Sequence, residues 1–173
     1  MTTPSGIAAL LLAALAACNP YTTRPAVTPL PEAISVGLDL PASRSLQLFA
    51  DSLAADSMPI ARVVLQDGWL ITPWFNAATY RPLTALHRPL GPGAVRVRAW
   101  ADPTRPGHSS LTIETAYRPF ADPSLPEREL DRAVPADHPV GIRIETLLRH
   151  LAAVYGDSAS MAPTPEVPVK TEQ

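Results

Sequence analysis

The sequence predicts an α+β domain in which two helices pack against an antiparallel sheet of about four or five strands. Three observations lead to this class. Several short runs alternate apolar and polar residues, which is typical of strands. Two longer runs repeat apolar residues at helical spacing. Turn residues, including many of the 21 prolines, separate these runs. The expected order is β-α-β-β-β-β-α.

The first strand and the first helix follow one another closely. Residues 34–40 alternate as a strand does. Ser43 is the expected N-cap of the helix, and Pro59 is expected to stop it. One face of this helix is apolar, since helical spacing aligns Leu46, Phe49, Ala50 and Leu53.

A hairpin is expected next, because Asp67-Gly68 separates the apolar runs 60–65 and 69–75. Pro73 places the second run at a sheet edge or at the end of a strand. If this run is one strand, its period of two puts Trp69 and Phe75 on one face and Trp74 on the other.

A second hairpin is expected after the irregular connection 76–93, from strands at 94–101 and 109–117. Alternation on the first of these strands separates an apolar side from a side with Arg96, Arg98 and Trp100. On that second side, Arg96 or Arg98 is expected to pair with Glu114.

The last helix is preceded by the proline-rich residues 119–135, with one helical turn expected at 127–132. Asp137 is the expected cap, and Gly156 is expected to end the helix. Its apolar residues repeat at helical spacing: Val140, Ile144, Leu147, Leu148, Leu151 and Tyr155.

The N-terminus has the pattern of an export signal. Residues 7–17 are all apolar, a run too short to span a bilayer but of the length found in secretory signals. The run ends in LAAC at 15–18, which resembles the lipobox of bacterial lipoprotein precursors. This resemblance implies cleavage before Cys18 and lipidation of that cysteine with diacylglycerol and a further acyl chain such as palmitate. Met1 to Gly6 departs from the usual pattern, because it contains no Lys or Arg.

The alternative for this segment is a buried N-terminal helix of a cytosolic protein. Asn19-Pro20 and the prolines that follow disfavour it, since they end a helix abruptly. The chain is therefore expected to divide into a signal peptide (1–17), a lipidated cysteine with a proline-rich tether (18–31), an α+β domain (32–156) and a disordered proline-rich tail (157–173).

A second resemblance extends to the domain. The element order, the tether and the segment DGWLITPWF at 67–75 are similar to BamC-like envelope lipoproteins. That family implies a helix-grip domain and a role in outer-membrane protein assembly. By analogy with lipoproteins, Asn19 after the cysteine favours the outer membrane, with the domain facing the periplasm.

Composition and motifs indicate no catalytic residue, metal site or cofactor. A net charge of −2 argues against nucleic-acid binding, and a single Cys excludes an intramolecular disulfide and a cysteine-based zinc site. No metal-binding spacing relates His87, His108, His138 and His150, and no G-x-S-x-G elbow is present.

The expected function is non-catalytic binding or a structural role, in contact with the membrane through the anchor and with other envelope proteins. Trp74, Arg96, Arg98 and Trp100 are the candidate interaction surface, because exposed Trp and Arg are typical of interface hot spots. The other reading is that the long loops cover Trp74 and Trp100. Two other functions stay open, a carrier of an apolar ligand between helix and sheet and an uncharacterised envelope hydrolase.

Overall fold

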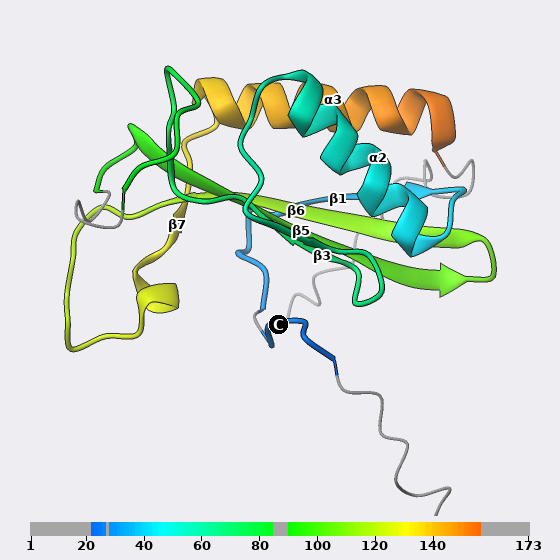
Figure 1. Cartoon of the computed structure of the whole chain (residues 1–173), viewed down its shortest axis with the longest axis horizontal. Helices are drawn as coiled ribbons and strands as arrows, with labels where there is room; N and C mark the ends of the chain where they lie inside the picture. The colour runs from blue at the N-terminus through cyan, green and yellow to red at the C-terminus, as the bar shows by residue number, and fades with distance from the viewer. Residues whose placement is uncertain (1–21, 27, 85–89, 157–173) are drawn as a thin grey trace, which may run out of the picture.

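The computed structural model describes residues 22–26, 28–84 and 90–156, so Cys18, the apolar run before it and residues 157–173 lie outside the described part. The α+β class is confirmed (Figure 1). The described residues form two long helices and an antiparallel sheet of seven strands, a wider sheet than the four or five expected.

The hairpin of β5 and β6 forms the centre of the sheet. β1 pairs with β6 on one side, and β3 and then β2 follow β5 on the other. The short β4 also pairs with β5, and the short β7 with β6. The strands are β1 (Ile34–Leu38), β2 (Arg62–Val64), β3 (Trp69–Ile71), β4 (Phe75–Asn76), β5 (Ala94–Arg105), β6 (His108–Tyr117) and β7 (Arg132–Ala133).

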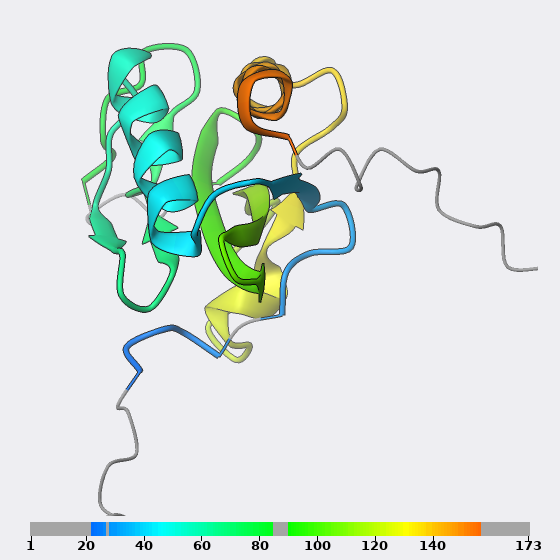
Figure 2. The ribbon, with the colours of Figure 1, turned by 90° about the vertical axis from the view of Figure 1, so that its right-hand side faces the viewer.

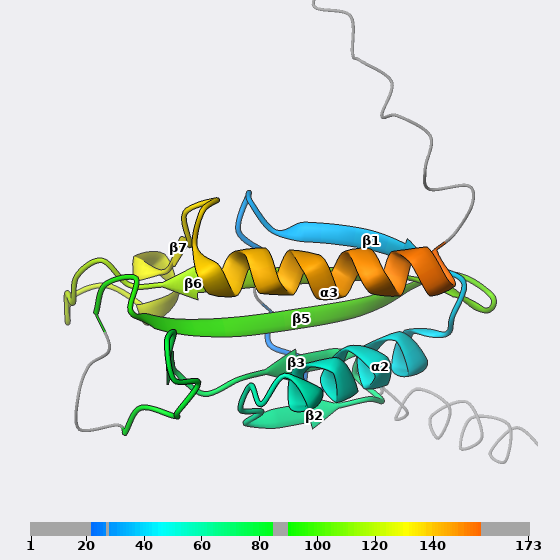
Figure 3. The same ribbon diagram turned by 90° about the horizontal axis from the view of Figure 1, so that it is seen from above.

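Both long helices, α2 (Ala42–Ala55) and α3 (Pro139–Tyr155), cover the same face of the sheet (Figures 2 and 3). The predicted apolar stripe of α2 faces inward, and Phe49 is fully buried. The two helices and the facing side of the strands enclose one apolar core, whose largest members include Leu46, Phe49, Leu53, Val97, Leu111, Ile113 and Ile144.

The helix ends correct two predictions. α2 follows Pro41 without a side-chain cap, so Ser43 lies inside the helix and is not its N-cap. α3 is capped by His138, whose Nδ1 accepts the backbone N–H of Val140 at 3.3 Å, and not by Asp137. Pro139 explains this shift, because proline is favoured at the first position of a helix and fixes the cap one residue before it. Gly156 ends α3 as predicted.

The run 69–75 is not one strand, which corrects the predicted faces of its aromatic residues. Pro73 has no N–H for the ladder, and Thr72 bonds Val97 twice, through its backbone N–H at 3.0 Å and its hydroxyl at 2.8 Å. The interruption changes the alternation. Phe75 therefore lies opposite Val95 in the core, whereas Trp69 lies opposite Trp100 on the other face.

The face without helices is covered by two extended segments. The first is the strap, defined as residues 22–26 and 28–31. The second is the 118–131 segment, which contains the 3-10 helix η1 (Glu127–Leu130), the helical turn expected from sequence. Figures 1 and 2 show both on the side of the sheet opposite α2 and α3. The described domain therefore has three layers, namely helices, sheet and extended segments.

Candidate functional site

The helix-free face of the central hairpin presents polar and aromatic side chains, as the predicted alternation required. Val97 and Ala99 are fully buried in the core, so Arg96, Arg98 and Trp100 project from the opposite face. The register places Arg98 directly opposite Glu114, and these two form the predicted cross-strand pair at 2.6 Å.

Glu114 is the centre of a buried charged network. Its carboxylate accepts from Arg98 and, at 2.6 and 2.8 Å, from Arg128 of η1. The backbone N–H of Leu30 in the strap donates to the same carboxylate at 2.9 Å. Glu114 is only 2% exposed, so these bonds replace the water that the buried charge has lost.

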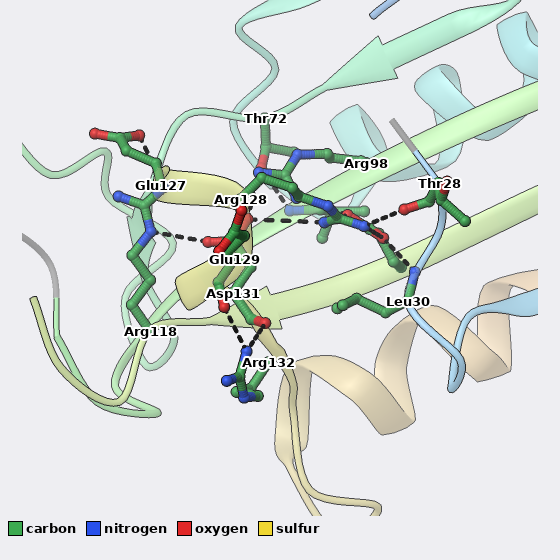
Figure 4. Close-up of polar contacts among 12 residues, drawn as sticks. Thr28, Leu30, Thr72, Arg98, Arg118, Glu127, Arg128, Glu129, Asp131 and Arg132 are labelled. Atoms are coloured by element: carbon green, nitrogen blue, oxygen red, sulfur yellow. Dashed lines mark hydrogen bonds and ion pairs between the residues drawn. The ribbon is translucent and has the colours of Figure 1, made fainter. Parts of the chain in front are cut away.

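Asp131 continues the network, as Figure 4 shows. Its carboxylate accepts from Arg98 at 2.7 Å and from Arg118 at 2.8 Å. Arg118 also bonds Glu127 at 2.8 Å. Positive and negative groups thus alternate along the charged network, which comprises Arg128, Glu114, Arg98, Asp131, Arg118 and Glu127.

At the outer end of the charged network, Arg118 and Glu127 stabilise each other's ionised forms. Burial opposes the charge of Arg118, but its bonds to Glu127 and Asp131 prevail and raise its pKa. The hydrogen bond from Arg118 lowers the pKa of Glu127. The arrangement is that of a structural clamp between η1 and the sheet.

Arg96 is the exception on this face, because it takes no part in the predicted pair with Glu114. No described partner bonds its buried Nε. Burial lowers the pKa of Arg96 to about 10, and repulsion from Arg98 and Arg118 adds to this effect. Its guanidinium lies 4.7 Å from the ring centroid of Trp74, and that of Arg118 lies 4.8 Å from the same centroid. Cation–π attraction to Trp74 therefore offsets part of the cost of burying the charge of Arg96.

The expected exposed aromatic patch is not observed. Trp74 and Trp100 are 8% and 3% exposed, although both lie on the helix-free face with Arg96 and Arg98. The strap and the 118–131 segment cover this face, and Thr23 Oγ1 accepts the indole N–H of Trp69, 6% exposed, at 3.4 Å. Trp74 and Trp100 are thus buried, as the other reading expected, although the strap contributes to the cover beside the predicted loop.

The strap is fixed at both of its ends. At its start, the backbone N–H and hydroxyl of Thr23 donate to Asp67 at 2.5 Å, and Arg24 forms a two-bond ion pair with Asp102. These bonds lower the pKa of Asp67 and raise that of Arg24. Near its other end, Arg128 bonds the carbonyl of Thr28 at 2.6 Å. The described part of the predicted tether is therefore attached to the domain.

The histidines that the structure describes make separate contacts and form no common site. His108 pairs with Asp39 at 2.7 Å beside the β5–β6 turn, while His138 bonds the carbonyl of Pro92 at 2.9 Å. His150 is exposed on α3, and His87 lies outside the described residues. Within the described ranges, no group of three or more His, Cys, Asp or Glu side chains could hold a metal ion.

A pocket of about 270 Å³ opens between α3, the start of β1 and β7. It exists because β1 and β7 pair with the same edge of β6 and leave an opening between them. Its lining is mainly apolar, with carboxylates at Glu32, Glu114 and Glu145, and its apolar side chains include Leu30, Ile34, Ile113, Val134 and Ile144.

The backbone of Thr115 contributes a polar group to this opening. Val97, its partner on β5, directs its own N–H and C=O toward Thr72. The N–H and C=O of Thr115 therefore point away from β5, and the carbonyl accepts from Val134 at 3.0 Å. The N–H of Thr115 points into the opening between β1 and β7. Sequence reasoning could not find this pocket, because β7 was not predicted.

None of the described helices is long and apolar enough to cross a bilayer. Comparison with known proteins found no family model and no curated protein that matches the chain.

Proposed function

We propose that the chain is a lipid-anchored protein of the bacterial envelope, held by Cys18 in the outer membrane and facing the periplasm. Its role is non-catalytic binding of other envelope proteins, as an accessory to outer-membrane assembly. The observation that carries this proposal is the attachment of the strap, together with the lipobox sequence that precedes it. The assembly role depends on the resemblance of residues 67–75 to BamC-like proteins.

The strap supports an anchor at Cys18 because its bonds to the domain would keep the lipid close to one defined part of the fold. Thr23 is bonded to Asp67, and only four residues separate it from Cys18. A free tether would leave the domain's orientation open, whereas this attachment restricts it. Two acyl chains on Cys18 would give stable membrane binding, which a single chain does not.

The charged network supports a binding role over catalysis. Glu114 and Asp131 are the most buried carboxylates of the helix-free face, and both are bonded to arginines. A general base needs an acceptor that can reach a substrate proton. These two carboxylates instead connect η1, β5 and β6, and so stabilise the arrangement of the domain.

Mass spectrometry of the protein from its native membrane tests the anchor, with Cys18→Ala as the matched control. The expected wild-type product begins at Cys18 and carries two or three acyl chains, and the variant carries none. A wild-type chain that retains residues 1–17 without lipid would overturn the proposal. Site-specific photo-crosslinking from exposed positions in the envelope then tests the partner, and the expected product is a specific adduct with another envelope protein.

A second candidate function, carriage of an apolar ligand, is favoured by the pocket between α3, β1 and β7. Its volume of about 270 Å³ is close to the lower end of ligand sites, about 300 Å³. Its carboxylates disfavour an anionic ligand, so 1-octanol is a suitable probe. The expected result is a shift of the methyl NMR signals of Ile34, Ile113 and Ile144.

The control for this test fills the pocket. Ala133→Leu places a larger side chain in the lining and is expected to abolish the shifts, while Ala153→Leu on the exposed side of α3 leaves them unchanged. Equal shifts in both variants would exclude this pocket as the binding site.

A further inference from the structure

The strap determines where the chain leaves the domain toward the proposed anchor. Thr23 and Arg24 are held by Asp67 and Asp102, at the end of the sheet that contains the β2–β3 turn. An extended chain spans at most about 3.6 Å per residue, so Cys18 can lie no farther than about 18 Å from Thr23. A lipid anchor would therefore keep this part of the helix-free side close to the bilayer.

The opposite end of the same side carries exposed apolar side chains. Phe120 and Leu125 are 49% and 42% exposed in the apolar loop, defined as residues 119–126. Leu90, which is 47% exposed, lines a shallow hollow together with Leu125. Large apolar side chains gathered at one end of a domain are typical of an interaction site.

The apolar loop has a defined conformation. Asp122 accepts the backbone N–H of Ser124 at 2.9 Å and its hydroxyl at 2.6 Å, which forms a local turn. The flanking Arg118 and Glu127 tie both ends of the loop to the charged network. Phe120 and Leu125 are therefore presented by a supported loop.

The strap and the apolar loop lie on the same side of the sheet. Figures 1 and 2 both show the 118–131 segment and the strap extending away from the helices on this side. The strap bonds Asp102 of β5, and Arg96 of β5 lies opposite Ala116, just before the 118–131 segment begins, so these points are about 20 Å apart at about 3.3 Å per residue. A flat surface parallel to the sheet can therefore contact both.

The charge of the loop indicates the kind of surface that it fits. Across residues 118–132, three arginines face four acidic residues, so the segment that contains the loop carries a net charge of −1. Because it has no excess of positive charge to attract anionic headgroups, its apolar side chains fit a neutral lipid surface.

From these observations we infer that the helix-free side is the membrane-facing side of the domain, and that Phe120 and Leu125 enter the bilayer as a second contact beside the anchor. This inference rests on the proposed lipidation of Cys18. The domain then lies with its sheet along the membrane and exposes α2 and α3 to the periplasm.

The test uses the lipidated full chain in vesicles of dioleoylphosphatidylcholine. Cys18 is the single cysteine and is blocked by lipid, so an introduced cysteine can be labelled selectively with an environment-sensitive fluorophore. Ala121→Cys reports on the apolar loop, and Ala153→Cys on the exposed side of α3. Brominated lipid is expected to quench the label at 121 several-fold more than the label at 153, and equal quenching overturns the inference.

Two pairs of variants separate specific contact from general proximity. Phe120→Ser with Leu125→Ser is expected to reduce quenching at 121 by at least half, while Ile142→Ser with Val154→Ser, on α3, leaves it unchanged. Arg24→Ala, which breaks the ion pair of the strap with Asp102, is expected to reduce the difference in quenching between the labels at 121 and 153. Arg143→Ala, which breaks the ion pair with Asp56 on the helical side, is expected to preserve that difference in quenching.

The same samples distinguish the two ways of failing. If mass spectrometry finds no lipid on Cys18, the proposed function fails and the inference fails with it. If the lipid is present but the label at 121 remains in water, the inference alone is wrong.

Discussion

The two faces of the sheet are stabilised by different interactions. On the helix-covered face, Phe49, Leu111 and Ile144 exclude water through apolar contact. On the helix-free face, the charged network and the strap cover β5 and β6, and the buried side chains include Glu114 and Asp131. The same two strands thus supply an apolar core on one face and a polar clamp on the other.

Side chains are buried on both faces of the sheet, so burial alone does not show which face is apolar. Apolar contacts are non-directional, so many sequences can fill the helix-covered face. The ion pairs and hydrogen bonds of the charged network are directional and connect segments far apart in the chain, such as Leu30, Glu114 and Arg128. The main effect of these contacts is therefore to fix the positions of the strap and η1, and their contribution to the net free energy of unfolding is smaller.

The largest effect is expected from Phe49→Ala on the helix-covered face. Phe49 is fully buried, and its truncation removes a large apolar surface and leaves a cavity. The free energy of unfolding should fall by about 4–5 kcal/mol, measured by urea unfolding followed by circular dichroism. A loss as small as that of an exposed apolar residue, for example Ile142→Ala as control, would contradict the assignment of the core.

A somewhat smaller effect is expected from Glu114→Ala on the helix-free face. This change leaves Arg98 and Arg128 with Asp131 as their one remaining shared carboxylate, and removing one partner of a buried pair costs about 3 kcal/mol. The lower end of the usual range applies because the side chain of Arg128 is 26% exposed and can turn toward water. The same unfolding measurement checks it.

Glu145→Ala is the matched control for this prediction, because its ion pair with Arg149 lies in the open on α3. Its expected effect is below about 1 kcal/mol. If both substitutions cost the same, the charged network contributes no more than a surface ion pair, and the contrast between the two faces is lost.

The elements with strong local patterns could be predicted from sequence. The class, both long helices, the β2–β3 turn at Asp67-Gly68 and the alternation on β5 and β6 follow from periodicity and turn residues. The pair of Arg98 with Glu114 follows from the same alternation. These features depend on residues that are close in the chain or directly opposite in one hairpin.

The remaining features depend on contacts that no local pattern contains. β4 and β7 are two residues long and exist only through pairing with β5 and β6. The break at Thr72 depends on a side chain that bonds Val97. Asp131 joins Arg98 across 33 positions, and Thr23 of the strap joins Asp67 of the β2–β3 turn across 44 positions. Such partners become visible only in the folded chain.

A third prediction concerns the turn that separates β2 from β3. Gly68 has a φ of +65°, and a Cβ at this position would overlap the carbonyl oxygen of Ala101. Gly68→Ala should therefore lower the free energy of unfolding by more than about 1 kcal/mol. Gly93→Ala is the control, because a Cβ there would meet open space. Equal stability of the two variants would mean that the turn can rearrange.

The smallest effect is expected from Glu127→Gln, and it should depend on pH. The bond from Arg118 lowers the pKa of Glu127 below its ordinary 4.5. A lowered folded-state pKa stabilises the protein above the unfolded-state pKa, and this contribution disappears as the pH falls through the folded-state value. The wild type should therefore exceed the variant in stability by a constant amount above about pH 5, and this difference should shrink below about pH 4.5.

The size of this difference should stay small, because the side chain of Glu127 is 77% exposed and water screens its ion pair. Urea unfolding of both proteins across the acidic range measures it. A difference that persists unchanged to about pH 3 would show that the carboxylate of Glu127 does not titrate against Arg118. It would also place the end of the charged network at Asp131, which is buried, and leave η1 attached through Arg128 and Asp131 alone.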